Sequence, residues 1–252
     1  MEEWKVKINY QKYIFSKQEW ILYSLEGVSI VAGIAYLFYQ RILAFLFLLP
    51  LIVLFIKEKK EQLCCSRKRE VNIQFKDAIQ AVSSALHAGY SVENAFIEAG
   101  NDMLTLYGKE SMITKEFQLL SGRIKSNETL ENILKDFARR SAIDDIQDFT
   151  DVFVTAKRSG GDFSMIIKRA VDSIGDKIEV KREIETLMSA KKFEQKIMNL
   201  VPFFIILYVK QSSPEFMKAL YGNWSGAIVM TVCLFLYLFA YYLSLKIVNI
   251  EV

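Results

Sequence analysis

Apolar residues gather near the two ends of the chain, and the middle mixes apolar and charged residues with a helical period. Between residues 73 and 193 apolar side chains recur three and four positions apart, the spacing that places them on one face of an α-helix. Six such stripes follow one another, with no alternating strand pattern between them. The pattern therefore predicts an all-α protein whose middle is a six-helix bundle, in which each stripe is buried against its neighbours.

Three short polar joints separate pairs of stripes. Each joint begins with a residue that tolerates the left-handed conformation closing a helix, and two residues later comes one able to cap the next helix. The first joint lies in LHAGYSVENAF, residues 86–96, and the second, in IKSNETLENIL, follows it by 38 residues. We expect the joints to be Gly89 with Ser91, Asn127 with Thr129, and Gly160 and Gly161 with Asp162.

The apolar ends predict two hairpins of membrane-spanning helices. Few polar residues interrupt these stretches, although a full bilayer crossing takes about 20 residues and two of them are shorter. Glu26 lies about one turn inside the first stretch, and we expect it near the lipid headgroups. The predicted spans are residues 21–39 and 42–56 in the first hairpin, and 197–209 and 226–245 in the second.

Lysine and arginine residues predict the orientation of these spans, because they concentrate in cytoplasmic segments. Residues 57–70 hold six of them, residues 191–196 hold a second cluster, and four lysines precede the first span. The loop of residues 210–225 has few. We therefore expect the segment 1–20, the domain 57–196 and the tail 246–252 to lie in the cytoplasm. A single long N-terminal span is the alternative, and it would place four lysines outside.

Composition and motifs give little sign of chemistry. The chain has 252 residues, of which 52% are hydrophobic, and its net charge of +3 is too small to indicate nucleic-acid binding. His87 is the single histidine, and the three cysteines have neither disulfide nor zinc spacing. Gly100 and Gly108 are too far apart for a phosphate-binding loop. We expect no catalytic, cofactor-binding or metal-binding residues, and hence a protein that is not an enzyme.

The most concentrated acidic group is Asp144, Asp148 and Asp151, which share one face of a predicted helix with Asp145 beside them. Like charges at this spacing destabilise a helix slightly. Three interpretations stay open: a solvated face, a docking surface for a basic partner, or a weak cation site. The neighbouring pair Arg139 and Arg140 is a second candidate for docking.

The order of these features resembles the type II secretion F-domain family, the polytopic platform proteins of secretion systems and type IV pili. AGYSVENAF matches the family's small–Gly–aromatic–Ser helix end, and SGGDFSMIIKRA with MNLVPFFIILYV matches its Gly-Gly turn and proline-containing membrane helix. The tail, SPEFMKALYGNWSG followed by a span, is most similar to the B and C platform proteins of tight-adherence (Flp) pili. Asn127 stands where the family usually has glycine.

The resemblance implies a platform in the cytoplasmic (inner) membrane that has no cofactor of its own. Its expected partners are a hexameric secretion ATPase in the cytoplasm, a sister platform protein or further copies of itself, and pilin subunits. We expect the ATPase to dock on the Asp144, Asp148 and Asp151 face or on the Arg139–Arg140 corner. The resemblance does not separate pili from secretion or DNA uptake, or B-type from C-type platforms. A small transporter or channel subunit is the alternative function.

Overall fold

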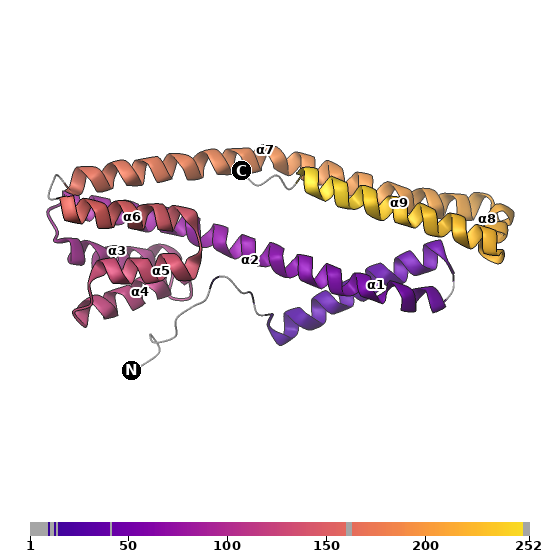
Figure 1. Ribbon diagram of the computed structural model, residues 1–252, viewed down its shortest axis with the longest axis horizontal. Coiled ribbons are helices and arrows are strands. Elements are labelled where there is room, and N and C mark those ends of the chain that lie inside the picture. Colours follow the sequence, from indigo (N-terminus) through magenta and orange to yellow (C-terminus); the bar gives the residue numbers. More distant parts are fainter. Residues whose placement is uncertain (1–9, 11–12, 14, 41, 160–162, 249–252) are drawn as a thin grey trace. The chain divides into compact units, whose positions relative to one another are not determined.

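A computed structural model of the protein describes residues 10, 13, 15–40, 42–159 and 163–248, and every regular element within these ranges is an α-helix (Figure 1). This confirms the expected all-α class. The helices are α1 (Lys17–Phe38), α2 (Ile42–His87), α3 (Val92–Tyr107), α4 (Met112–Lys125), α5 (Leu130–Ser141), α6 (Asp144–Ser159), α7 (Phe163–Ser212), α8 (Pro214–Gly222) and α9 (Trp224–Val248).

The chain divides into two compact units. The first comprises Met1–Ile14 and Glu61–Val180, and the second comprises Phe15–Lys60 and Lys181–Val252. Helix α2 has 46 residues and helix α7 has 50, and both run without interruption from one unit into the other. These boundaries differ from the domain expected at 57–196, because a helix that continues through the boundary leaves no break in the sequence pattern.

One hydrophobic core holds the first unit together, and it takes buried side chains from every helix between α2 and α7. Phe75 of α2 meets Phe137 of α5 and Phe149 of α6 edge to face, with ring centroids 6.0 and 5.6 Å apart. Such aromatic pairs add roughly 0.5–1.5 kcal/mol to the stabilisation that burial gives. The large, fully buried residues include Phe75, Ile79, Phe96, Met103, Ile113, Phe117, Leu120, Leu130, Phe137, Phe149 and Phe153.

The first two joints have the backbone that helix closure requires. The φ angles of Gly89 and Asn127 are 88° and 60°, both in the left-handed region. The Ser91 hydroxyl caps α3 by accepting a hydrogen bond from the Asn94 N–H at 3.4 Å. Thr129 is the N-cap residue of α5, without a side-chain hydrogen bond. The third joint, Gly160, Gly161 and Asp162, lies outside the described residues.

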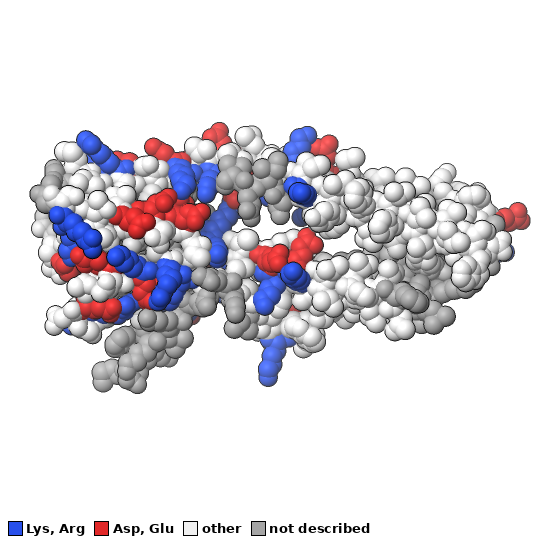
Figure 2. Space-filling model, in the orientation of Figure 1, with Lys and Arg blue, Asp and Glu red and all other residues white. Residues whose placement is uncertain are grey.

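The second unit has a smaller core and a largely apolar surface. Ile34 and Phe38 of α1 pack with Met230 and Leu234 of α9, and side chains from the apolar ends of α2 and α7 join them. Many large hydrophobic side chains on α1, α7 and α9 stay exposed, among them Leu25, Phe204 and Phe235 at 71, 64 and 71%. Charged side chains gather over α3 to α6 and are sparse around α8 and α9 (Figure 2).

Within the described ranges, two helices are long and apolar enough to cross a membrane, Lys17–Phe38 and Trp224–Ile247. They correspond to the first and fourth expected spans. The second and third expected spans, residues 42–56 and 197–209, are the apolar ends of α2 and α7. The predicted loop at residues 210–225 instead contains the short helix α8, in which Pro214 occupies the first turn, a position where proline is well tolerated.

Candidate functional site

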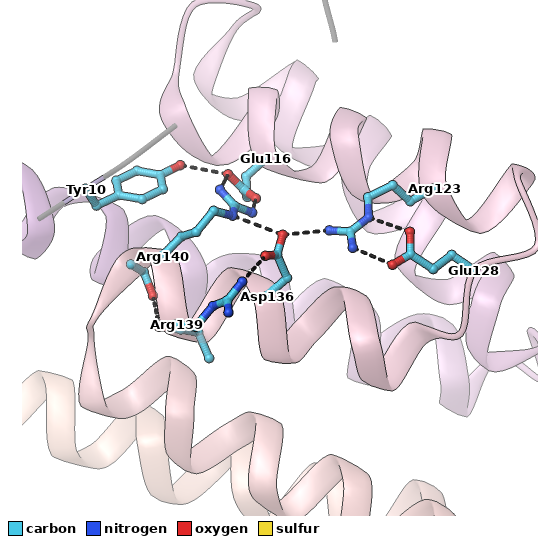
Figure 3. Close-up of polar contacts among 9 residues, drawn as sticks. Tyr10, Glu116, Arg123, Glu128, Asp136, Arg139 and Arg140 are labelled. Atoms are coloured by element: carbon cyan, nitrogen blue, oxygen red, sulfur yellow. Dashed lines mark hydrogen bonds and ion pairs between the residues drawn. The ribbon is translucent and has the colours of Figure 1, made fainter. Parts of the chain in front are cut away.

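The core of the first unit contains a group of charged side chains on α4 and α5 (Figure 3). Glu116 stands on α4 between the core residues Ile113 and Phe117, so its position on the helix carries it inward. Asp136 and Arg140 are four residues apart on α5 and therefore share a face. The exposed fractions of the Glu116 and Asp136 side chains are 4 and 9%. A charge taken out of water to this extent requires a partner.

Glu116 finds its partners in Arg140 and Tyr10. The Arg140 guanidinium donates from Nη1 to Glu116 Oε2 at 3.1 Å and from Nη2 to Oε1, so the ion pair is bidentate. The Tyr10 phenol donates to Glu116 Oε2 at 3.0 Å (Figure 3). A planar guanidinium matches both oxygens of a carboxylate at once, which lysine cannot do. Arginine is therefore the cation suited to this position.

Asp136 extends the group toward the joint between α4 and α5. Its Oδ2 atom accepts from Arg140 Nε at 3.1 Å and from Arg123 Nη1 at 2.9 Å. Arg123 also donates to Glu128 from Nε at 2.7 Å and from Nη2 at 2.5 Å. Glu128 directly follows the left-handed Asn127. The turn after α4 therefore places the Glu128 carboxylate against Arg123 of that same helix.

We call this group of ion pairs the α4–α5 network. It contains three carboxylates and three guanidiniums, so its charges balance. Its members are Glu116, Glu128 and Asp136 with Arg123, Arg139 and Arg140. Burial alone would lower the pKa of Arg140, but the hydrogen bonds and charges of Glu116 and Asp136 outweigh it and leave that pKa raised. The hydrogen bond and charge of Glu128 raise the pKa of Arg123. Burial, then the charge and hydrogen bond of Glu116, raise the pKa of Tyr10.

Each carboxylate of the α4–α5 network is held by at least one guanidinium. The network gives a rigid connection between α4 and α5, because a buried ion pair that loses one partner leaves an expensive unpaired charge.

The predicted acidic face lies on α6, and the structure divides its members. Asp144, Asp148 and Asp151 are exposed, whereas the side chain of Asp145 is only 2% exposed. Lys177 of α7 approaches Asp145 Oδ1 at 2.5 Å and Asp148 Oδ2 at 3.3 Å. The hydrogen bond with Asp145 is the main cause that raises the pKa of Lys177. Lys177 thus neutralises part of this face and ties α6 to α7.

Asp144 and Asp151 keep the outward position that docking requires. Gln147 donates to both carboxylate oxygens of Asp151, at 3.1 and 3.2 Å. No three His, Cys, Asp or Glu side chains within the described ranges converge closely enough to hold a metal ion.

The two arginines of the second docking candidate have different positions. The Arg139 side chain is 81% exposed and touches Asp136 Oδ1 at 3.2 Å. The Arg140 side chain is 11% exposed and belongs to the buried network. Arg140 therefore does not present its charge to a partner, because α5 turns this position toward α4. Only Arg139 of the pair stays on a surface that a partner can reach.

Sequence reasoning missed most of the α4–α5 network. A signal for Glu116 was present, since a carboxylate interrupts the apolar stripe of α4. The pairing of Arg123 with Asp136 had no such signal, because it depends on the angle at which the two helices meet. Tyr10 stands far from these residues in the sequence, 106 positions before Glu116.

Comparison of the chain with models of known protein families, with curated proteins and with solved structures gives no match.

Proposed function

We propose that this protein is a multi-pass platform protein of the cytoplasmic membrane, serving a tight-adherence-like type IV pilus or a type II secretion machine. In this role it couples a cytoplasmic secretion ATPase to the assembly of pilin subunits. The observation that carries the proposal is the construction of α2 and α7. Each is a single helix with one end in a charged, well-packed unit and the other end in an apolar unit.

Four spans are the arrangement that best suits the apolar unit. Helices α1 and α9 pass the length and composition test for a membrane span, and the apolar ends of α2 and α7 pack with them in one core. Gly27 of α1 also brings that helix close to Ile52 and Phe55 of α2. The large hydrophobic side chains left exposed on this unit then face lipid, where their exposure costs nothing.

The first unit is the proposed cytoplasmic six-helix bundle. The cluster of Lys and Arg in residues 57–70 and the second one in residues 191–196 flank the apolar ends of α2 and α7. The excess of such residues on the cytoplasmic side of membranes supports cytoplasmic N- and C-termini. Rigidity supports a mechanical role: the α4–α5 network and the aromatic core hold the bundle, and α7 continues from the bundle to the proposed third span.

Energy for pilin movement comes, in this proposal, from the ATPase rather than from the platform. The ATPase docks on the exposed part of α6, with Asp144, Asp148 and Asp151 as its acidic contacts, and Arg139 of α5 is a further, basic contact. A sister platform protein or further copies of this chain, and the pilins, are the other partners. The proposed role requires no catalysis and no cofactor.

Crosslinking in native membranes, followed by purification in detergent and mass spectrometry, tests the function. We expect to recover a secretion ATPase together with pilins or a sister platform protein, with crosslinks on the bundle. Recovery of the protein with a soluble substrate-binding component and no ATPase would favour the transporter alternative and would contradict the proposal.

Charge reversal tests the docking face. Asp144→Lys with Asp151→Lys changes two exposed carboxylates and leaves the Lys177 pairs intact, so we expect stable, membrane-inserted protein that no longer recovers the ATPase. The matched control is Glu98→Lys with Asp102→Lys, two exposed acidic residues of α3. Equal ATPase recovery from both double variants would remove α6 from the docking surface while leaving the function itself untouched.

A further inference from the structure

We propose that the outer face of helices α3 and α4 is the surface through which two copies of this chain associate. The face is an open groove whose two rims carry opposite charges, so it is complementary to a second copy of itself. This inference rests on the part of the proposed function that includes further copies of the chain, and it needs neither the ATPase nor the pilins.

Helices α3 and α4 lie side by side and run in opposite directions (Figure 1). The Thr114 hydroxyl of α4 donates to the Met103 carbonyl of α3 at 3.0 Å. A Cβ atom added at Gly100 would lie 3.5 Å from the Cβ of Phe117 and 3.6 Å from the Oγ of Ser121. The absence of a side chain at Gly100 therefore lets the two helices approach closely, and these contacts fix which residues of α3 lie opposite which residues of α4.

An open groove of about 590 Å³ lies between the outer sides of the two helices. Ile97 and Leu104 of α3 line one wall, and the small residues Ser121 and Gly122 of α4 line the other. Leu104 is 40% exposed. Apolar groups in a concave surface are stabilised when another protein surface covers them and removes them from water.

The two rims of this groove carry opposite charges. Lys125, in the last turn of α4, lines the groove on one side. On the other side the groove-lining Asn101 donates from Nδ2 to Glu98 Oε2 at 3.1 Å, which holds that carboxylate beside the rim of α3. Glu98 and Lys125 are both exposed, and neither forms an ion pair with another described residue. Each rim therefore offers a charge that its own chain leaves unpaired.

A two-fold axis along the groove brings these charges together between copies. It places α3 of one copy against α4 of the other at the same height. Because Gly100 lies opposite Phe117 and Ser121, Glu98 then comes within roughly one helical turn of Lys125 of the second copy. A two-fold interface is formed by the same patch on both chains, so this ion pair forms twice. A second copy is thus the occupant whose charges match both rims at once.

Cysteine crosslinking of the full chain in native membranes tests the surface. The three native cysteines are changed to serine. One tagged copy carries Asn101→Cys on α3, and a differently tagged copy carries Gln118→Cys on α4, both exposed positions. We expect a short bismaleimide to join the two copies. Two controls are expected to stay unlinked: copies that both carry Asn101→Cys, and a pair in which Lys135→Cys of α5 replaces Gln118→Cys.

Charge reversal in both copies then tests the pairing. Glu98→Lys or Lys125→Glu alone turns two attractions between the copies into repulsions, and we expect each to lower the crosslink yield roughly fivefold or more. Glu98→Lys with Lys125→Glu should restore the yield, because the exchanged charges meet again across the two-fold axis. The exchange would not restore the binding of another protein's helix in the groove. Absence of the crosslink, single reversals without effect, or an exchange that fails to restore the yield would each overturn the proposal.

The outcome is separable from that of the proposed function. Glu98→Lys leaves α6 unchanged, so this variant is expected to lose the crosslink between copies and still to recover the ATPase. Absence of the ATPase from every sample, with the crosslink present, would contradict the motor-platform function and leave the α3–α4 surface standing.

Discussion

Adjacent arginines on α5 illustrate how strongly burial decides what one residue does. Replacing Arg140 by Met leaves Glu116 with Tyr10 as its one hydrogen-bond donor among the described residues, and it removes the hydrogen bond from Arg140 to Asp136. Breaking a buried ion pair by removing one partner costs about 3–5 kcal/mol. We therefore expect Arg140→Met to lower the free energy of unfolding of the first unit by this amount, measured by denaturant titration of the purified protein in detergent.

Arg139→Met is the matched control, because it removes the same charge one position away. Its side chain is 81% exposed, and an exposed ion pair contributes at most about 1 kcal/mol. Similar losses from the two variants would contradict the buried network.

The contacts of single side chains are harder to predict from the sequence than the helices or the units. An apolar stripe predicts which face of a helix is buried, and this succeeds for residues such as Phe75, Phe117 and Phe137. It does not predict which charged residues follow that face inward. Position 140 continues the stripe of Ile133 and Phe137, whereas position 139 does not, but the charge of both arginines favours the surface.

The joint at Gly89 forms the turn between α2 and α3. A substitution at Gly89 tests whether this turn needs a residue that tolerates the left-handed conformation. A Cβ atom added at Gly89 has no heavy atom within 4 Å, so the substitution Gly89→Ala introduces backbone strain alone. A non-glycine residue in the left-handed region costs about 1–2 kcal/mol, and we expect Gly89→Ala to lose this much stability in thermal unfolding. Asn127→Gly, at the equivalent position, should be neutral or stabilising. Destabilisation by both changes would contradict the left-handed role.

The corner between α8 and α9 depends on a glycine for a different reason. A Cβ atom on Gly226 would clash with the Leu220 carbonyl oxygen and lie 2.7 Å from the Leu220 Cα, both backbone atoms that cannot move alone. We expect Gly226→Ala to force the two helices apart and to reduce the yield of monodisperse protein in size-exclusion chromatography.

Gly33→Ala is the control for that variant, because a Cβ atom there meets nothing within 4 Å. Gly33 lies in α1, which like α9 is a candidate span, so a general intolerance of glycine changes in the apolar unit would appear in both variants. Normal behaviour of Gly226→Ala would contradict the close approach of α8 and α9.

The sequence predicts which helices form more readily than it predicts where each helix begins and ends. Helical period, the left-handed positions at Gly89 and Asn127 and the cap at Ser91 locate the turns around α3 to α5. Nothing in the sequence marks where α2 passes from the apolar to the charged unit, since good helix formers continue through residues 57–70. Helix α8 is missed because nine residues are too few for a clear period.

At the scale of the whole molecule, the proposed function depends on the two long helices. Helices α2 and α7 each continue from one unit into the other without a loop. In the proposed function, displacement imposed on the first unit is carried by helix rather than by loop. Such coupling suits a platform that receives force on one side of a membrane and applies it within the membrane.

The proposed topology makes a prediction that the native thiols can check. Cys65 is exposed on α2 just after its apolar end, and Cys233 is exposed on α9 within the proposed fourth span. In intact cells, a membrane-impermeant maleimide should label neither residue. After permeabilisation it should label Cys65 and still not Cys233, because lipid excludes the reagent. Asn223→Cys, placed between α8 and α9 in a Cys65→Ser background, should be labelled in intact cells.

Each departure from this pattern has a separate meaning. Labelling of Cys65 from outside would reverse the orientation that the lysine and arginine clusters indicate. Labelling of Cys233 would place α9 in water, and the apolar surface of the second unit would then need a protein partner rather than lipid to cover it. Failure of Asn223→Cys to react in intact cells, with Cys65 of the unsubstituted chain reacting after permeabilisation, would contradict the placement of the α8–α9 corner outside the cell. Only the complete pattern is compatible with two hairpins that hold the bundle where a cytoplasmic motor can reach it.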